Sequence, residues 1–558
     1  MSTTTPQLPT INSRQDHIFP KLTPAQIDRI AAHGRVRSIQ QGQVLVEQGD
    51  KVVPFFVVKT GELEIVRPSA GSEMLITIHG PSQFSGEVNL LSGRRSLARI
   101  RVRQSGEVIE LDREHLLNLI QTDAELSEIL MRAFILRRVE LMAHGLGDVV
   151  VVGSRHSAGT LRIKEFLMRN GHPYSYIDLD RDADVQELLD RFHVSPADVP
   201  VIICRGDLVL RNPTNQEIAR CLGFNETIDQ AHVRDLVIVG AGPSGLAAAV
   251  YGASEGLDVL VLETNSPGGQ AGSSSRIENY LGFPTGISGQ DLAGRAFTQA
   301  TKFGAQVVIA NGATRLTCNR RPYKIEIDDG AHIPARAVII ATGAEYRKLP
   351  IENLTRFEGA GVYYGATFIE AQLCGGEEVI VVGGGNSAGQ AAVFLAATAK
   401  RVHVLVRAAG LSDTMSRYLI RRIEETPNIV FRPHTEIVSL DGSEHLERVT
   451  WRDNQTGNTE VHEIRHIFLM TGAVPNTRWL DGCVALDPKG FIKTGQDLSP
   501  DELTSARWSL SRRPYLLETS LPGIFATGDV RGGSMKRVAS AVGEGSIAVS
   551  FVHQVLHE

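Results

Sequence analysis

The 558-residue sequence has few cysteines and no long apolar run. Its five cysteines are Cys204, Cys221, Cys318, Cys374 and Cys483, and no two of them form a Cys-x-x-Cys pair. Such a sparse, odd set suits a reducing compartment better than a disulfide scaffold. Since no stretch of roughly 18 apolar residues occurs, and the N-terminus has no apolar secretory core, we expect no membrane span and a cytoplasmic protein.

The sequence also lacks an excess of positive charge. The formal net charge is −6 and the pI is about 6.3, which argues against a nucleic acid or an anionic membrane as partner. Glycine is abundant instead, with 54 residues, many of them in the turn motifs described below. At roughly 100–200 residues per domain, the length indicates several domains.

The apolar pattern changes several times along the chain. Residues 1 to about 22 are polar and predict a loose tail. Short apolar runs between glycine turns predict strands up to about Ser105, and apolar residues spaced by three and four predict helices from about Asp112 to Met142. Residues 148 to about 225 alternate strand and helix patterns, which predicts a small α/β domain. The alternation continues from Leu236 to the end.

A strand, a glycine turn, a helix and a second strand follow one another at 236–263. The first strand runs into Gly240-x-Gly242-x-x-Gly245, and the second strand ends at Glu263. In such a turn the first glycine allows the bend, the second lets the backbone approach a pyrophosphate, and the third lets helix and strand pack closely. Glu263 is placed to bind a ribose diol. The unit predicts a dinucleotide site; a glycine turn without ligand is the weaker alternative.

A second unit of the same kind spans residues 379–407. Its turn is Gly383-x-Gly385-x-x-Ala388, and the strand after its helix leads to Arg407 without an acidic residue. A cation at this place suits a 2′-phosphate, which favours NADPH over NADH. Three more arginines follow on a predicted helix, where a solvated helix face is the alternative: Arg417, Arg421 and Arg422. Two dinucleotide units in one chain predict a flavin paired with a nicotinamide for hydride transfer.

Further motifs complete a family resemblance. They are SPGGQ (266–270), RIENYLGFP (276–284), AVIIATGA (337–344), IFLMTGAVPNT (467–477) and TSLPGIFATGDVRGGSMKRVASAVGEG (519–545). Together with the glycine units, they make residues 234–558 resemble the low-molecular-weight thioredoxin reductases. The resemblance implies an NAD(P)H-dependent FAD oxidoreductase with two nested Rossmann-like domains. The split FAD domain would span 227–350 and 482–558, and the NAD(P)H domain 351–481.

The resemblance also implies which residues bind the cofactors. The ADP half of FAD would be held by Gly240, Gly242, Pro243, Ser244, Gly245 and Glu263. The rest of FAD would meet Gly269, Gln270, Asn279, Gly343, Gly528, Asp529, Arg537 and Val538. NADPH would be held by Gly385, Asn386, Ser387, Ala388 and Arg407. No catalytic side chain and no metal ligand is assigned, and the family habit implies a homodimer. An insertion-like stretch, 498–517, is left open as an interface or a flavin-covering loop.

One departure from the family concerns its redox dithiol. The family pattern Tyr-Cys-Ala-Thr-Cys is here Tyr364-Gly365-Ala366-Thr367-Phe368. Thiol–disulfide exchange needs a thiolate, which glycine and phenylalanine do not supply. Cys374 lies nearby, either as a substitute thiol or as a buried structural residue. Reduced flavin would therefore pass electrons directly to a redox protein, a quinone, oxygen or a small molecule; disulfide reduction and a cyclic-nucleotide-responsive redox sensor are the alternatives.

The first domain, set at residues 1–145, resembles a cyclic-nucleotide-binding domain, a β-roll followed by helices. Its segment GEVNLLSGRRSLA supplies the binding candidates Gly86, Glu87, Arg95 and Ser96. The family glutamate accepts from the ribose 2′-hydroxyl and the arginine pairs with the cyclic phosphate. Arg95 stands one residue nearer to Glu87 than is usual, and Arg94 replaces the usual proline. A domain that only docks or dimerises is therefore an equal alternative to one that binds a cyclic nucleotide effector.

The second domain, residues 146–226, resembles a thioredoxin/glutaredoxin-like fold. Ser157 and Thr160 stand where its thiols would be, and Val199-Pro200 matches its cis-proline position. The segment VQELLDRF (185–192) predicts one of its helices. Without thiols, the domain is expected to be structural or partner-binding. Cys204 and Cys221 are expected to be two buried free thiols, or a pair if folding brings them together.

Overall fold

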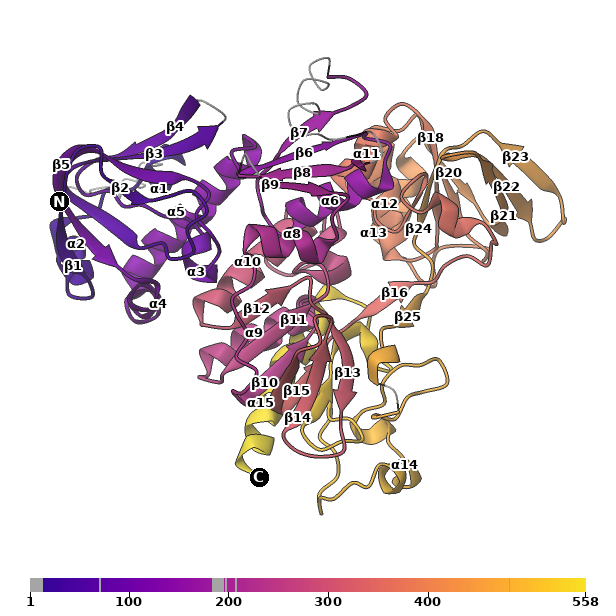
Figure 1. The fold of residues 1–558 in the computed structure, drawn as a ribbon. Coiled ribbons are helices and arrows are strands. Elements are labelled where there is room, and N and C mark those ends of the chain that lie inside the picture. The colour runs from indigo at the N-terminus through magenta and orange to yellow at the C-terminus, as the bar shows by residue number, and fades with distance from the viewer. Residues whose placement is uncertain (1–13, 70–71, 183–194, 196–197, 206–207, 481) are drawn as a thin grey trace, which may run out of the picture.

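The computed structural model describes residues 14–69, 72–182, 195, 198–205, 208–480 and 482–558. Figure 1 shows four units along the chain, and the C-terminal segment returns to the third of them. We call them the first unit (residues 14–143), the second unit (149–222), the third unit (234–340 together with 524–557) and the fourth unit (362–469).

The first unit is an antiparallel roll closed by helices. It comprises α1 (Arg14–Ile18), α2 (Pro24–Ala31), β1 (Arg35–Ile39), β2 (Val44–Val46), β3 (Phe55–Ser69), β4 (Ser72–His79), α3 (Asn89–Ser92), β5 (Arg99–Leu111), α4 (Arg113–Thr122) and α5 (Ala124–Ala143). The strand order is β1-β5-β3-β4, with β2 paired to β5. Phe55, Phe84 and Phe134 contact one another in its core.

The prediction of a loose tail to residue 22 is wrong for its last nine residues. Residues Arg14–Ile18 form a short helix, and both Ile18 and Leu22 are buried. Ile18, Phe19 and Leu22 form a short apolar group that is too brief to establish a helical period. The burial of Ile18 and Leu22 depends on the surface that the roll offers them, which the local pattern does not reveal.

The second unit is a small sheet with helices against it. It comprises β6 (Val149–Gly153), α6 (Ala158–Arg169), β7 (Ser175–Asp178), β8 (Val201–Cys204), β9 (Leu208–Arg211) and α8 (Asn215–Leu222). The strand order is β7-β6-β8-β9, with β6 and β7 parallel and the other pairs antiparallel. The Val199–Pro200 bond is cis, as expected. The predicted helix 185–192 lies outside the described residues.

The third unit is a seven-stranded sheet that carries the first glycine turn. It comprises β10 (Arg234–Val239), α9 (Pro243–Ser254), β11 (Val259–Glu263), α10 (Gly289–Lys302), β12 (Gln306–Ile309), β13 (Ala313–Thr317), β14 (Tyr323–Ile327), β15 (His332–Ile340), β26 (Ile524–Ala526) and α15 (Val538–His557). The order is β12-β11-β10-β15-β14-β13, with β26 beside β15. Strands β12, β11, β10, β15 and β26 run parallel, so their carboxyl ends meet at one edge.

The fourth unit repeats this parallel arrangement around the second glycine turn. It comprises β17 (Val362–Tyr363), α11 (Phe368–Leu373), β18 (Glu378–Val382), α12 (Asn386–Ala396), β19 (Arg401–Leu405), α13 (Arg417–Glu425), β20 (Ile429–Arg432), β21 (Thr435–Gly442), β22 (Leu446–Asp453), β23 (Thr459–His462) and β24 (His466–Leu469). Its main sheet has the order β17-β24-β18-β19-β20. The antiparallel ribbon of β16 (Ala344–Tyr346) and β25 (Ala473–Pro475) connects the third and fourth units.

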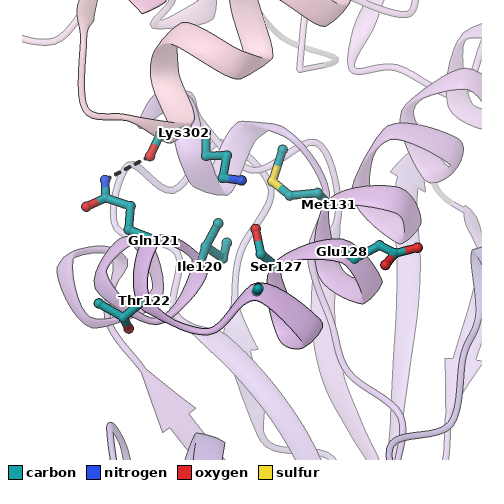
Figure 2. Close-up of a pocket in the computed structure, with 8 residues that line it drawn as sticks. Ile120, Gln121, Thr122, Ser127, Glu128, Met131 and Lys302 are labelled. Atoms are coloured by element: carbon teal, nitrogen blue, oxygen red, sulfur yellow. Dashed lines mark hydrogen bonds between the residues drawn. The ribbon is translucent and has the colours of Figure 1, made fainter. Parts of the chain in front are cut away.

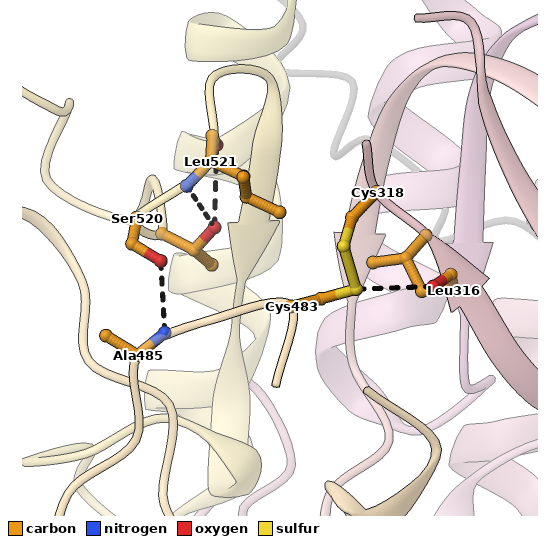
Figure 3. The surroundings of a disulfide bond; sticks show 7 residues. Leu316, Cys318, Cys483, Ala485, Ser520 and Leu521 are labelled. Atoms are coloured by element: carbon orange, nitrogen blue, oxygen red, sulfur yellow. Dashed lines mark hydrogen bonds between the residues drawn. A yellow bond between two sulfur atoms is a disulfide. The ribbon is translucent and has the colours of Figure 1, made fainter. Parts of the chain in front are cut away.

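The predicted cysteine pattern needs one correction. Cys318 and Cys483 form a disulfide between the end of β13 and the segment that returns from the fourth unit (Figure 3). The two residues are 165 positions apart in the sequence, so only the fold brings them together.

The stretch 498–517, which includes α14 (Pro500–Ser505), is fixed to the C-terminus, because Arg512 pairs with both Glu518 and Glu558.

Candidate functional site

The first glycine turn leaves room in front of helix α9. Gly240 has a φ of 106°, and a Cβ there would lie 2.3 Å from the carbonyl oxygen of Ala341. A Cβ on Gly245 would lie 1.9 Å from the carbonyl oxygen of Gly240. By contrast, a Cβ on Gly242, the residue just before the helix, would meet nothing within 4 Å. Gly240 and Gly245 therefore allow the tight turn, because a side chain at either position would clash with the backbone. Gly242 keeps the helix N-terminus open to a phosphate group.

Glu263 joins this turn to the loop after strand β11. The residue is only 7% exposed, and its carboxylate accepts hydrogen bonds from the backbone N–H groups of Ala241 at 2.8 Å and Asn265 at 2.9 Å. The acid predicted to bind a ribose thus lies beside the glycine turn. The geometry fits an adenosine ribose at the end of β11.

The residues predicted for the flavin side gather around the same helix end. A Cβ on Gly269 would lie 3.1 Å from Gly242 Cα, and the Gln270 side chain donates to the Ala344 carbonyl. Gly528 lies against Ser244, whose Oγ would be 2.7 Å from a Cβ at residue 528. These contacts bring together residues from both halves of the third unit.

The remaining flavin-side predictions differ in burial. Burial raises the pKa of Asp529, an effect that the nearby Lys536 opposes. Gly343 has a φ of 65° and open space around it. Val538 is half-buried and opens α15, whereas Asn279 and Arg537 are exposed. Asp529 and Val538 are therefore partly shielded from solvent, and Gly343 offers only its backbone. Asn279 and Arg537 are open to solvent.

The second glycine turn has the same geometry in the fourth unit. Gly383 has a φ of 142°, and a Cβ there would lie 2.4 Å from the Met470 carbonyl oxygen. Around Gly385, just before α12, there is again open space, and Ala388 is buried beneath the turn. Asn386 is already engaged, because its side-chain oxygen accepts from the Ser416 N–H at 2.7 Å.

The predicted cations of the nicotinamide site separate into two groups. Arg407 lies just beyond the end of β19 and is exposed, and so are Arg417 and Arg421 on α13. Arg422 is exposed as well, but its guanidinium forms an ion pair with Glu278 of the RIENYLGFP segment. Arg407 thus follows β19, the strand after the glycine turn and its helix. The ion pair of Arg422 instead joins α13 to the 276–284 segment.

One cleft brings the two predicted cofactor sides together. It is lined by Gln270 and Ser273, by Tyr346 of the connecting ribbon, by Gly365 and Ala366, and by Ser387 at the start of α12. Burial raises the pKa of Tyr346, and a hydrogen bond with Ser387 opposes this shift. The sequence did not predict Ser273 or Tyr346, because no motif marks them and only the packing of the units places them here.

Three residues of the segment predicted to stand in place of the family dithiol, Tyr364, Gly365 and Ala366, line this cleft. Gly365 faces Ser273, and a Cβ at residue 365 would lie 3.7 Å from it, an ordinary contact distance. Cys374 lies at the end of α11, fully buried, with its Sγ donating to the Glu370 carbonyl at 3.3 Å. Burial raises the pKa of the Cys374 thiol to about 12. A buried structural cysteine therefore fits this geometry, because a reactive cysteine needs access and a thiolate.

The two cysteines of the second unit lie together but are not bonded. Cys204 and Cys221 are both buried and free. Their side-chain hydrogen bond raises the pKa of Cys204 and lowers that of Cys221. Folding thus brings them into contact, while they remain two buried free thiols as expected.

The four candidate cyclic-nucleotide residues all contact protein groups. Glu87 forms an ion pair with Arg138 at 2.6 Å, and Gly86 accepts from Arg137 at 2.8 Å. Arg95 donates to the Gly49 carbonyl at 2.9 Å, and Ser96 donates to the Ala98 carbonyl at 2.7 Å. Arg95 also lies against Gly223, where a Cβ would be 2.5 Å from its Nε.

A separate cleft lies between the first and third units. Figure 2 shows it between helices α4 and α5 and the end of α10, where Gln121 donates to the Lys302 carbonyl at 2.9 Å. Its volume is about 370 Å³, and none of the predicted site residues lines it. Within the described ranges, no cluster of three His, Cys, Asp or Glu side chains is arranged for a metal ion. Among the described helices, none is long and apolar enough to cross a membrane.

Two known protein families match parts of this chain. The family described as pyridine nucleotide-disulphide oxidoreductase matches residues 234–545, and the cyclic nucleotide-binding domain family matches residues 36–123. Thioredoxin reductase of Bacillus subtilis is 30% identical over 332 residues, covering 59% of this chain and 97% of that protein. The thioredoxin reductase of Mycoplasma genitalium is 33% identical over 325 residues, covering 58% and 95% respectively.

Solved structures show the same similarity. The crystal structure of Lactococcus lactis thioredoxin reductase in its FR conformation has a TM-score of 0.52 and 27% identity, covering 58% of this chain and all of that one. That match and the family match concern the half of the chain that contains both glycine turns. The chain therefore belongs to the pyridine nucleotide-disulphide oxidoreductase family, as an NAD(P)H-dependent FAD oxidoreductase with a cyclic nucleotide-binding domain before it.

Proposed function

We propose that this chain transfers a hydride from NADPH to FAD and that electrons leave the flavin directly for an external acceptor. The observation that carries the proposal is the shared cleft, in which flavin-side Gln270 and nicotinamide-side Ser387 line one space. Hydride transfer requires the two rings to meet without intervening water, and the nearness of these two predicted cofactor sides supports a meeting of the rings there.

The chain's own residues bind and orient the cofactors. The turns at Gly240–Gly245 and Gly383–Ala388 offer helix N-termini to the pyrophosphates. Glu263 is placed for the adenosine ribose of FAD, and Arg407 for the 2′-phosphate of NADPH. FAD, when bound, supplies the centre that accepts the hydride and delivers electrons. No side chain needs to act as an acid or a base.

The acceptor is proposed to be a redox protein, a quinone, oxygen or a small molecule. The segment Tyr364–Phe368 carries no thiol, and Cys374 is buried with a pKa of about 12. Thiol–disulfide exchange needs an accessible thiolate, and none of the described residues that line the cleft is a cysteine. The relatives are named thioredoxin reductases, which keeps disulfide reduction as the alternative to test.

Anaerobic rapid mixing of the FAD-loaded protein with NADPH, and separately with NADH, tests the proposal. We expect NADPH to bleach the flavin absorbance faster than NADH, and the reduced protein to be reoxidised by a quinone or oxygen but not by thioredoxin. Failure of both nicotinamides to bleach the flavin would refute the central step. Rapid reoxidation by thioredoxin would favour the alternative.

We also propose that a cyclic nucleotide regulates the flavin site, which the match of residues 36–123 supports. A nucleotide at Glu87 and Arg95 would have to replace the ion pair with Arg138 and the bond to the Gly49 carbonyl. Binding would thus be linked to a rearrangement beside Gly223 of the second unit. Calorimetry with cAMP and cGMP, combined with NADPH oxidation rates, tests this; no heat and no change in rate would leave docking or dimerisation as the domain's role.

Three further expectations remain proposals. The order β7-β6-β8-β9 with helices α6 and α8 supports a thioredoxin-like domain at residues 146–226. We propose a homodimer, which sedimentation velocity of the loaded protein would test. A cytoplasmic location is proposed from the family resemblance, and fractionation of the producing cells would test it.

A further inference from the structure

The turn after helix α6 lies on a loop of the flavin site. Helix α6 packs the Leu161 and Met168 side chains against the fourth unit, and its Ile163 and Phe166 side chains lie in the hydrophobic core that the second and third units share. The helix ends at Arg169, and the turn 169–171 follows. Helix α6 of the second unit therefore lies against both of the units that carry a glycine turn.

Several hydrogen bonds connect this turn and its surroundings to the third unit. Arg169 Nη2 donates to the Gly269 carbonyl at 2.6 Å, and Asn170 Nδ2 donates to the Asn265 carbonyl at 3.2 Å. Asn215, at the start of α8, donates to Asn265 Oδ1 at 2.9 Å. Gln290 of the third unit donates back to the Met168 carbonyl at 2.7 Å.

The loop that receives these bonds, residues 265–269, joins the two ends of the predicted FAD site. At its start, the N–H of Asn265 donates to Glu263, the predicted ribose ligand. Further on, the Gly268 N–H donates to the Ala241 carbonyl at 2.7 Å, inside the glycine turn. At its end, Gly269 lies against Gly242 and precedes Gln270. A displacement of this loop would move both the ribose end and the flavin end of the site.

Arg169 is well fixed for such a contact. Its side chain is 11% exposed, and its Nη1 lies 3.3 Å from a carboxylate oxygen of Glu165. Its Nε is buried and has no hydrogen-bond partner among the residues that the structure describes. A buried guanidinium that donates to a carbonyl forms a charge-assisted bond, which is stronger than one between neutral groups.

The first unit supports the same turn from the other side. Arg94, which is buried, donates to the Asn170 carbonyl at 2.8 Å, and Arg138 donates to the Gly171 carbonyl at 3.1 Å. The turn thus has protein contacts on both sides, so it is a rigid support for the loop rather than a surface turn.

We propose that Arg169 is a positioning residue for FAD: by holding the Gly269 carbonyl, it fixes loop 265–269 in the shape that accepts the cofactor. The second unit then supports the flavin site by holding this loop in place. This inference rests on the proposed FAD site at Glu263 and Gln270.

The test compares Arg169→Met with Arg169→Lys and with the control Lys164→Met. Lys164 lies on the same helix and stacks on Tyr176 within its own unit, 4.1 Å from the ring centroid. We expect Arg169→Met to weaken FAD binding about tenfold and to change the visible circular dichroism of the bound flavin. Arg169→Lys keeps one donor and should recover part of the affinity, whereas Lys164→Met should match the unaltered protein.

Hydrogen exchange of residues 265–272 in the FAD-free full chain provides a second readout. We expect faster exchange there in Arg169→Met and not in Lys164→Met. Equal FAD affinity and equal loop exchange in these two variants would overturn the proposal. If Arg169→Met does not fold, Arg169→Lys and Asn170→Ser decide it by the same two measurements. If the unaltered protein binds no FAD, the proposed function fails, while loop exchange still decides the positioning role.

Discussion

Replacing Arg407 with alanine should weaken the binding of NADPH while leaving that of NADH almost unchanged. Arg407 lies just past strand β19, next to the strand that carries the second glycine turn. In such a unit this position meets the 2′-substituent of the adenosine ribose. NADH has a hydroxyl there and no phosphate, so it loses little when the guanidinium is removed.

The size of the effect follows from exposure. A hydrogen bond to a charged group contributes about 1.5–3 kcal/mol, and exposed pairs lie at the low end because water and salt screen them. Arg407 is exposed. We therefore expect about 1.5 kcal/mol, or slightly more than a tenfold rise in the dissociation constant for NADP⁺. The effect should shrink at high salt.

Isothermal titration of the FAD-loaded protein with NADP⁺ and with NAD⁺ measures this directly. Arg422→Ala is the matched control, because the guanidinium of Arg422 is already paired with Glu278. We expect this control to change NADP⁺ binding much less than Arg407→Ala does. Equal weakening of NADP⁺ and NAD⁺ by Arg407→Ala, or an equal loss of NADP⁺ binding in the control, would refute the assignment of Arg407 to the 2′-phosphate.

Three further predictions concern other parts of the chain. Gly545→Ala should lower the flavin content of the purified protein, because a Cβ there would lie 2.1 Å from the Ser244 carbonyl oxygen and push α15 away from α9. The control is Gly543→Ala, since a Cβ at residue 543 would meet open space. The ratio of flavin absorbance to protein absorbance measures the effect. Cys374→Ser should leave NADPH oxidation and any disulfide reduction unchanged, since the thiol is buried; a selective loss of disulfide reduction in a coupled thioredoxin assay would contradict this. Burial lowers the pKa of His79 to about 3, with Arg137 adding to the effect, so its folded pKa lies below the ordinary 6.5 and stability falls as the pH drops below 6.5. Between about pH 7 and about pH 5 the free energy of unfolding of the first unit should fall by about 2 kcal/mol, and it should fall less in His79→Leu. Hydrogen exchange of residues 73–79 in urea, corrected for intrinsic rates, measures this change. An equal fall in the variant would count against the prediction.

The sequence predicted the elements whose form depends on neighbouring residues. The two glycine turns, the strands before them and the helices after them form where expected, because the spacing of glycines and the run of apolar residues act over a few positions. The same local logic places Glu263 at the end of β11. It failed for residues 14–22, whose apolar side chains become buried only because the roll is present.

By itself, then, the sequence determined the family, the two dinucleotide turns and the absence of thiols at residues 364–368. Only the tertiary structure decided which distant residues meet. It joins Cys318 to Cys483, places Gln270 and Ser387 in one cleft, pairs Glu87 with Arg138, and sets Arg169 against loop 265–269. The physical reason is that these contacts join units far apart in the sequence, so they depend on how whole surfaces pack, which no local spacing encodes.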